Sequence, residues 1–265
     1  MTHLQAFLMG LLQGLTEFLP VSSSGHLELM KAIFGIHSEK SMVFTVVVHG
    51  ATVLSIIVVF WKDIWHLIKA FFRFRWDDDM KYIAKLLLSA VPAGIVGLLF
   101  EKQLEEFFTG NVLFVGLMLW VTTIFLVLTI WAKDRQRPIN FWDSLIIGLA
   151  QAVAVIPGIS RSGATISTGL LLGNKKDEVA KFSFLMVIIP VIGANFMEIM
   201  QNHGNLQAAS NISFGALAIG FVTAFVSGVL ACKYMIHLVR KSKISYFAIY
   251  TFIIGLIAVI YGVTH

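Results

Sequence analysis

The sequence is poor in cysteine and in charged residues. Its 265 residues include a single cysteine, Cys232, so no internal disulfide framework can stabilise the fold. Only 13% of the residues are charged, which is about half the share in soluble globular domains. Apolar residues make up 57% of the chain and the mean hydropathy is +0.83. These values exclude a soluble globular domain and indicate an integral membrane protein. The N-terminus lacks a basic region, so no cleavable signal peptide is expected.

Long uncharged runs supply candidate membrane-spanning helices, each of which needs roughly 20 apolar residues. Four runs meet this length without any charge. Two further runs carry one charged residue, Lys85 or Glu198, close to an end where it can reach the interface. The six predicted spans are 41–61, 82–100, 107–132, 182–200, 212–232 and 244–265. We therefore predict an all-α polytopic membrane protein.

One segment of the chain occurs twice. The run GLLQGLTEFLPVSSSG at 10–25 recurs as GLAQAVAVIPGISRSG at 148–163, an offset of 138 residues. Internal duplication of this kind is the first feature to interpret in a sequence. The copies differ in residues with reactive or charged side chains. Glu17 and His26 occur only in or beside the first copy, and Arg161 and Thr165 only in or beside the second.

The duplicated segments are too short to cross a bilayer. Each reads as two short helices separated by proline and serines, which predicts a re-entrant hairpin surrounded by protein or by a water-filled cavity. A pair of short spanning helices is the alternative, and it gives the same sidedness for every other loop. Each half of the duplication holds one hairpin and three spanning helices, and this odd number of crossings inverts the second copy. We therefore predict an inverted-topology repeat of residues 1–132 and 139–265 within a single membrane domain, 1–265. The two hairpin tips are then expected to meet near the bilayer midplane.

Lysine and arginine are distributed unevenly between the predicted loops. When the loops alternate between two sides of the membrane, sixteen of the 20 Lys and Arg fall on one side and three on the other, with Arg161 inside the second motif. The positive-inside rule makes the first side cytoplasmic and places both termini outside. The first hairpin then enters from outside, so we expect the site to open to the outer face. The net charge of +5 follows from these loops and gives no indication of a nucleic-acid partner.

The serines of both motifs precede short helices, where serine is a favoured N-cap. Two helix N-termini directed at one place form a site for an anion, and the number of donors favours phosphate over carboxylate. Arg161 supports this interpretation, because a guanidinium at membrane depth costs at least ~2.5–3.5 kcal/mol and usually marks function. The alternative is that the small residues only allow close helix packing. The candidate phosphate-binding residues are Ser22, Ser24, Gly25, Gly158, Ser160, Ser162, Gly163 and Thr165.

The same motifs hold the groups that phosphoryl transfer requires. A serine such as Ser23 would attack phosphorus, His26 would move the proton, and Arg161 would stabilise charge on the equatorial oxygens. Two plainer interpretations stay open: Glu17 can be no more than the counter-ion of Arg161, and His26 can be structural. His49 interrupts an apolar span and could line the same cavity, although a packed polar residue is the commoner explanation.

Taken together, the two motifs resemble the signature pair of the undecaprenyl-diphosphate phosphatases, the bacitracin-resistance family. The run from Gln13 to His26 matches the first motif, and the PGxSRSxxT pattern from Pro157 to Thr165 matches the second. The resemblance extends over the whole chain. It implies a bacterial plasma-membrane enzyme that hydrolyses undecaprenyl diphosphate to undecaprenyl phosphate and inorganic phosphate. That reaction recycles the carrier lipid for peptidoglycan synthesis and confers bacitracin resistance.

The resemblance also implies site residues and a cofactor. The residues expected to act in catalysis or phosphate binding are Glu17, Ser23, His26, Ser160, Arg161, Ser162 and Thr165. A divalent cation, Mg²⁺ or Ca²⁺, is expected near the first motif. Gln13 replaces one of the carboxylates found in the family, so Glu17 is the only acidic ligand there, with Gln13 beside it.

A phosphate site inside an apolar protein suits a lipid whose head group enters while its tail stays among membrane lipids. A transporter or flippase of a lipid phosphate or another anion is the main alternative, because inverted repeats with broken helices are typical of transporters. A transporter would need Arg161 and the helix ends but not both Ser23 and His26. A structural assembly subunit would leave the embedded charges unexplained. The sequence determines neither the attacking serine nor the oligomeric state.

Overall fold

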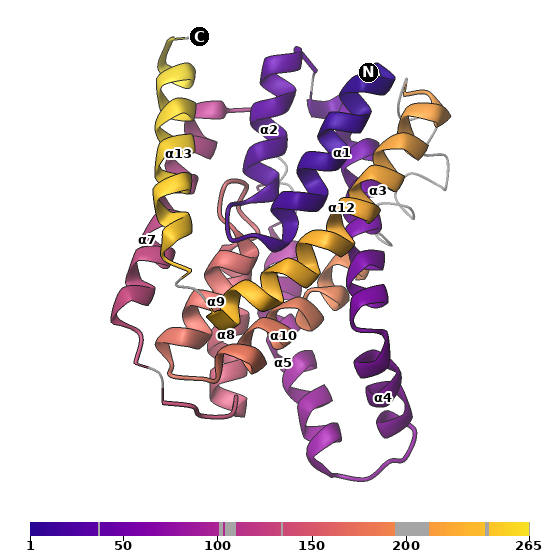
Figure 1. Cartoon of the computed structure of the whole chain (residues 1–265), viewed down its shortest axis with the longest axis vertical. Helices are drawn as coiled ribbons and strands as arrows, with labels where there is room; N and C mark the ends of the chain where they lie inside the picture. The colour runs from indigo at the N-terminus through magenta and orange to yellow at the C-terminus, as the bar shows by residue number, and fades with distance from the viewer. Residues whose placement is uncertain are drawn as a thin grey trace.

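The computed structural model describes residues 1–36, 38–100, 103, 110–133, 135–193, 212–241 and 244–264. The regular structure in these residues is helical, apart from an isolated bridge between Arg137 and Asn174. Figure 1 shows the arrangement. The helices are α1 (His3–Phe18), α2 (Ser23–Phe34), α3 (Ser38–Val59), α4 (Trp61–Phe71), α5 (Asp78–Leu99), α7 (Val112–Leu128), the short 3₁₀ helix η1 (Thr129–Trp131), α8 (Phe141–Val153), α9 (Arg161–Leu171), α10 (Lys176–Met186), α12 (Phe214–Lys241) and α13 (Tyr246–Thr264).

Four described helices, α5, α7, α12 and α13, are long and apolar enough to cross a membrane. A fifth span results if α3 and α4, which bend by 80° at a short break, count as one. These helices correspond to five of the six predicted spans. The sixth, 182–200, begins in α10 and runs into residues 194–200, which lie outside the described part of the chain. The prediction of an all-α protein with several membrane-spanning helices is confirmed.

Large apolar side chains on the spanning helices face outward. Leu98, Ile124, Leu230 and Ile257 are each more than half exposed, as expected where a helix faces lipid instead of water. The largest buried cluster lies inside, where Phe18, Phe182 and Met186 are among the fully buried side chains. The interior therefore contains both this apolar core and the polar residues described below.

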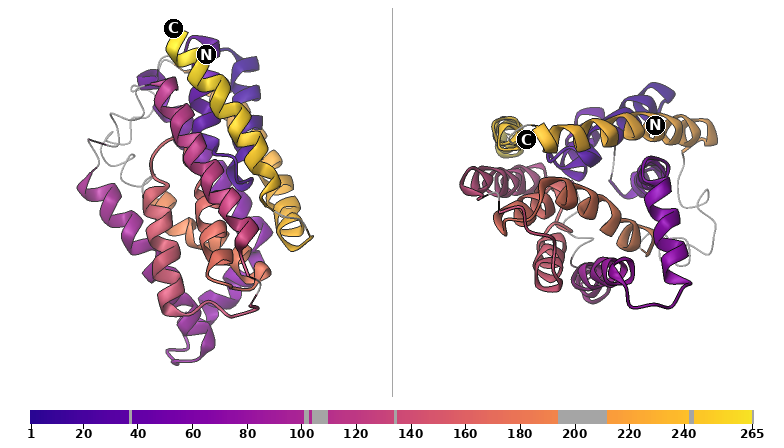
Figure 2. Two further views of the ribbon diagram at one scale, coloured as in Figure 1. Left: turned by 90° about the vertical axis from the view of Figure 1, so that its left-hand side faces the viewer. Right: turned by 60° about the horizontal axis from the view of Figure 1, so that its bottom comes forward.

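The two short helix pairs form hairpins that approach one another. Helix α1 packs on α2 and helix α8 packs on α9. Figure 1 shows both chain termini at one end of the molecule, with the α1–α2 hairpin extending inward from that end and the α8–α9 hairpin extending from the opposite end. Figure 2 gives the same arrangement from two further directions and shows α7 beside α13, two helices that pack closely. The turns of the two hairpins consequently meet in the middle of the structure.

Each hairpin is seated on a helix of the other half of the chain. Helix α1 packs on α12, and helix α8 packs on α5. A Cβ atom added to Gly10 would lie 2.5 Å from the carbonyl oxygen of Gly220, and one added to Gly148 would lie 2.5 Å from that of Ser89. Gly10 and Gly148 are counterparts in the duplication, so the same sequence position provides the close backbone approach in both hairpins. The inverted relation of the complete halves, 1–132 and 139–265, stays a prediction.

Candidate active site at the contact of the two hairpins

The serine turns of the two hairpins have the same pattern of hydrogen bonds within each turn. Ser22 is the N-cap of α2 and its hydroxyl accepts from the N–H of Gly25 at 3.2 Å. Ser160 is the N-cap of α9 and accepts from Gly163 N–H at 3.1 Å. In both turns the N-cap hydroxyl lies 3.3 Å from that of the serine two residues on, Ser24 or Ser162. The expected N-caps are present, and the duplicated sequence forms the same cap twice.

The two turns also contact each other through hydrogen bonds. The N–H of Gly158 donates to the hydroxyl of Ser24 at 3.3 Å, and the hydroxyl of Ser162 donates to the carbonyl of Leu19 at 3.0 Å. Ser24 and Ser162 are counterparts, so each turn reaches the other with the same serine. The predicted meeting of the hairpin tips is therefore observed, although no membrane defines its depth.

Helix α7 supports the second turn. The hydroxyl of Thr122 donates to the carbonyl of Gly158 at 3.1 Å and accepts from the N–H of Ser160 at 2.8 Å. Gly158 has a φ of 96°, and a Cβ there would lie 2.6 Å from the Cβ of Met118. Both the backbone conformation and the close approach to α7 thus require glycine. Thr122 was not anticipated, because its position in an apolar run carries no motif.

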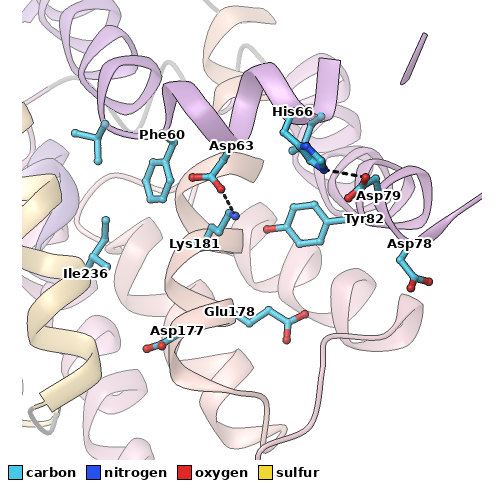
Figure 3. A pocket seen from close by; sticks show the side chains of 12 residues that line it. Phe60, Asp63, His66, Asp78, Asp79, Tyr82, Asp177, Glu178, Lys181 and Ile236 are labelled. Carbon is cyan, nitrogen blue, oxygen red and sulfur yellow. Dashed lines mark hydrogen bonds and ion pairs between the residues drawn. The ribbon is translucent and has the colours of Figure 1, made fainter. Parts of the chain in front are cut away.

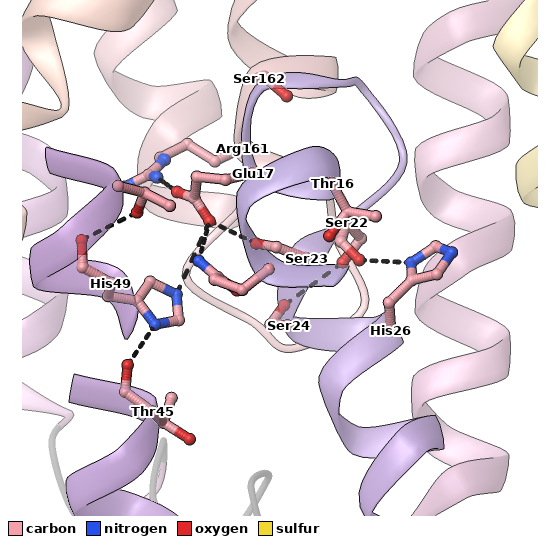
Figure 4. Close-up of polar contacts among 12 residues, drawn as sticks. Thr16, Glu17, Ser22, Ser23, Ser24, His26, Thr45, His49, Arg161 and Ser162 are labelled. Carbon is pink, nitrogen blue, oxygen red and sulfur yellow. Dashed lines mark hydrogen bonds and ion pairs between the residues drawn. The ribbon is translucent and has the colours of Figure 1, made fainter. Parts of the chain in front are cut away.

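Glu17 is the centre of a buried polar cluster formed by both hairpins (Figure 4). Its Oε2 accepts from the hydroxyl of Ser23 at 2.6 Å and from the side-chain amide of Gln13 at 2.8 Å. Its Oε1 accepts from the guanidinium of Arg161, which comes from the start of α9. The residue is 9% exposed. Three predicted site residues, Glu17, Ser23 and Arg161, are thus brought into direct contact from two separate motifs.

His49 on α3 also faces this cluster. Its Nε2 lies 3.8 Å from Oε2 of Glu17, and its Nδ1 is 2.8 Å from the carbonyl oxygen of Thr45. Because a carbonyl can only accept, Nδ1 carries a proton and Nε2 is directed at the carboxylate. A histidine within an apolar span was the only sequence signal for this residue.

Two other predicted site residues lie outside the Glu17 cluster. The ring of His26 points to the far side of the serine turn (Figure 4) and bonds Ser22 and Tyr250. The hydroxyl of Thr165 donates to the carbonyl of Arg161 at 2.8 Å and lies 2.6 Å from the hydroxyl of Ser183. Both residues adjoin the site but neither touches the carboxylate of Glu17 in the described contacts.

The cavity beside the cluster is very small. It measures about 10 Å³ and is lined by Glu17, Arg161, Ser162, Phe18 and Phe184, among others. A volume of this size holds about one water molecule. This space is too small for a phosphate group, and we call the arrangement in which Arg161 is paired with Glu17 the closed form of the site.

A larger cavity lies elsewhere, between α4, α5, α10 and α12 (Figure 3). It measures about 660 Å³. An ion pair between Asp63 and Lys181 at 2.5 Å and a hydrogen bond between His66 and Asp79 at 2.9 Å cross it. Carboxylates outnumber cationic groups in its lining, which opposes the binding of a phosphate. The cluster at the hairpin tips is therefore the better candidate site. The acidic lining residues are Asp63, Asp78, Asp79, Asp177 and Glu178.

The donors available to a metal ion are few. Within the described residues, no group of three or more His, Cys, Asp or Glu side chains is arranged to hold a metal. The side-chain carbonyl oxygen of Gln13 is buried without a hydrogen-bond partner, next to Glu17. The amide nitrogen of Gln13 faces Glu17, so its carbonyl oxygen would join the carboxylate as a ligand only if the amide turned over. The two would then suit a cation that takes its other ligands from water and phosphate, as Mg²⁺ commonly does.

Comparison with known proteins identifies the family of this chain. Residues 6–257 match the family model described as bacitracin resistance protein BacA. A protein of Christiangramia forsetii named undecaprenyl-diphosphatase is 52% identical over 97% of both chains. One of the same name from Parabacteroides distasonis is 48% identical over 98% of both chains, and another from Korarchaeum cryptofilum is 36% identical over 95% of this chain and 96% of its own. This chain belongs to the bacitracin resistance protein BacA family.

Proposed function

We propose that this chain is a membrane phosphatase that hydrolyses undecaprenyl diphosphate to undecaprenyl phosphate and inorganic phosphate. The observation that carries the proposal is the contact of Ser23, Glu17 and Arg161, a hydroxyl, a carboxylate and a guanidinium built from two motifs. Relatives that are 52% and 48% identical to this chain bear the name undecaprenyl-diphosphatase. The reaction returns the carrier lipid to peptidoglycan synthesis, and extra enzyme opposes bacitracin, in keeping with the family description.

Ser23 is the nucleophile in this proposal, because its hydroxyl already donates to a carboxylate at 2.6 Å. It attacks the terminal phosphorus while its proton passes to Glu17. The bond between that phosphorus and the bridging oxygen breaks, and undecaprenyl phosphate leaves. Water then attacks the phosphoserine, which releases inorganic phosphate and returns the proton to Ser23.

Arg161 provides the charge that binds and stabilises the phosphate. A guanidinium binds planar arrays of oxygen acceptors in a fixed geometry. In the closed form it is bonded to Glu17, so an entering phosphate would replace the carboxylate as its partner. The N-terminal amides of α2 and α9 adjoin the same place and add donors for the equatorial oxygens.

Glu17 and Gln13 are the residues that would hold a divalent cation. The ion, when bound, would neutralise charge on the diphosphate. The unpartnered carbonyl oxygen of Gln13 supports this assignment.

A lipid substrate in the plasma membrane fits the surroundings of the site. The cluster is enclosed by helices with exposed apolar side chains, so a polyprenyl tail can remain among membrane lipids while the head group enters. We place both termini outside and the entrance at the outer face. The distribution of lysine and arginine supports this orientation, and so does the approach of the first hairpin from the end that carries both termini.

The test is phosphate release from undecaprenyl diphosphate by the full-length protein in detergent with Mg²⁺. Wild type should turn over, Ser23→Ala should not, and Ser89→Ala should match wild type, because the hydroxyl of this buried serine donates only to the carbonyl of Leu86 within α5. Undecaprenyl diphosphate bound by the wild type without phosphate release would refute the proposal. Movement of that lipid across proteoliposomes without hydrolysis would identify a transporter instead.

A further inference from the structure

Both ring nitrogens of His26 are bonded. Nδ1 lies 2.7 Å from the carbonyl oxygen of Ser22, and Nε2 lies 2.8 Å from the hydroxyl oxygen of Tyr250 on α13. The His26 and Tyr250 rings are parallel, with an interplanar angle of 1° and centroids 5.6 Å apart. The histidine is 6% exposed. The ring is thus held between two partners, neither of which is Ser23 or Glu17.

The bonding pattern defines where the proton lies. The carbonyl of Ser22 can only accept a hydrogen bond, so Nδ1 of His26 carries a proton. In the neutral ring, Nε2 then accepts from the hydroxyl of Tyr250, which fixes this tautomer. A histidine bonded in this way has no free lone pair with which to deprotonate Ser23.

Ser22 adopts a backbone conformation that requires such support. Its φ is 71° and its ψ is 94°, a region that residues other than glycine rarely occupy. Conformations of this kind persist where surrounding contacts hold them. The carbonyl of Ser22 accepts both from Nδ1 of His26 and from the backbone N–H of His26, at 2.7 Å and 3.2 Å.

The second copy of the motif provides an internal comparison. The counterpart of Ser22 is Ser160, which has an ordinary φ of −73°. The counterpart of His26 at the same offset is Ala164, which has no side chain able to hold a carbonyl. The unusual turn therefore occurs in the copy that contains the histidine.

The turn also determines the direction of the next residue. Ser23 follows Ser22 directly, and its hydroxyl reaches Glu17 at 2.6 Å. The counterpart of Ser23 is Arg161, which approaches the same carboxylate from the other hairpin. A change at the Ser22 carbonyl would rotate Ser23 away from Glu17.

We propose that His26 and Tyr250 are positioning residues. The hydroxyl of Tyr250 fixes the ring of His26, the Nδ1–H of His26 holds the Ser22 carbonyl, and this contact keeps the hydroxyl of Ser23 against Glu17. The inference rests on the proposed phosphatase function. It replaces the proton-transfer role that the sequence predicted for His26 and assigns a role to Tyr250, which no motif marks.

The variants are chosen to separate a donor from a proton carrier. His26→Asn places an amide N–H where Nδ1–H lies but has no titratable group, whereas His26→Ala has neither. Tyr250→Phe keeps the ring and removes the hydroxyl. Controls are His237→Asn, at an exposed position on α12, and Tyr246→Phe, at an exposed position on α13.

We expect His26→Asn to keep kcat within about threefold of wild type with the same pH profile. Tyr250→Phe loses one hydrogen bond, so we expect its kcat to decrease by up to roughly tenfold. In His26→Ala we expect kcat to decrease by about 10–100-fold while KM changes little. The two controls should match wild type. If His26→Asn is folded and as inactive as His26→Ala, His26 carries the proton and the proposal is wrong.

A second readout does not depend on turnover. In protein labelled with ¹⁵N-histidine, the His26 signals are identified by their loss in His26→Asn. We expect a protonated Nδ1 in wild type and an altered Nε2 signal in Tyr250→Phe. An unprotonated Nδ1 would overturn the inference. Absence of phosphate release by the wild type would instead refute the proposed function, and the imidazole signals would still test the positions of His26 and Tyr250.

Discussion

Glu17 on α1 and Arg161 on α9 form a direct ion pair although 144 residues separate them in the chain. The two side chains come from different copies of one duplicated motif, and each occupies a position where the other copy has a different residue. Breaking a buried pair of this kind by removing one partner is strongly destabilising, by about 3–5 kcal/mol. The ion pair therefore contributes both to joining the hairpins and to the proposed chemistry.

We predict that Arg161→Lys lowers kcat by about 10²-fold, because an ammonium keeps the charge but loses the planar array of donors. Phosphate release with undecaprenyl diphosphate measures the effect. Arg75→Lys, in an exposed loop, is the matched control and should leave the rate unchanged. Equal rates for Arg161→Lys and wild type would show that Arg161 serves only as a charge.

The neighbouring serines Ser22 and Ser23 of the first turn should respond differently to alanine. Ser23→Ala should lose activity by on the order of 10³-fold or more, as expected for a nucleophile, while the lost hydrogen bond to Glu17 should cost no more than about 1.5–3 kcal/mol of stability. Ser22→Ala removes an N-cap and should cost about 1 kcal/mol of stability, and Ser160→Ala should cost a similar amount because the two caps are alike. Thermal unfolding in detergent and phosphate release distinguish the two effects. A stable, fully active Ser23→Ala would exclude Ser23 as the nucleophile.

Alanine at Gly10 or Gly148 should destabilise the protein by more than about 2 kcal/mol, because the new methyl group would meet backbone oxygen at 2.5 Å. Gly94 and Gly97 on α5 are the controls, since a Cβ there would meet no described atom within 4 Å. In those helical positions alanine should be neutral or stabilising by up to about 1 kcal/mol. Melting temperatures of the four variants, compared in one detergent, test the expectation. Equal tolerance at all four positions would argue against the described seating of the hairpins.

The orientation in the membrane leads to a prediction for the loop between α4 and α5. A reporter that is active only outside the cell should give no signal when fused within residues 72–77, and the same reporter fused at the C-terminus should be active. Comparison of the two fusions shows that a silent 72–77 fusion does not result from poor expression of the protein. A bright signal from the 72–77 fusion would reverse the assigned sidedness.

Much of the site could be predicted because its residues lie in two recognisable runs. The N-caps Ser22 and Ser160 follow from serine before a short helix, and the duplication predicts that their turns meet. Glu17 and Arg161 were identified as embedded charges that need a partner or a function. These are local signals, so one sequence is sufficient to read them.

The remaining contacts depend on how distant helices pack together, and no local motif in the sequence marks them. Tyr250 lies 224 residues from His26, and Thr122 lies in an apolar helix with no periodic pattern that marks its inner face. Spanning helices are apolar on the lipid side and on the protein side alike, so hydrophobic periodicity cannot orient them. For the same reason the motif gave no sign of the contact between His26 and Tyr250 on α13, on which the proposed positioning role of His26 rests.

The seating of α1 on α12 also bears on how the protein is made. Helix α1 ends at Phe18 and α12 begins at Phe214, so the ribosome adds about 200 residues before the first hairpin can acquire its main neighbour. Through that interval Glu17 lacks the covering helix, and for most of it Arg161 has not yet been made. A lone carboxylate in hydrocarbon is costly. A hairpin that stayed at the membrane surface until synthesis had supplied the C-terminal helices would avoid this cost. In this protein, the segment translated first would be among the last to reach its final depth.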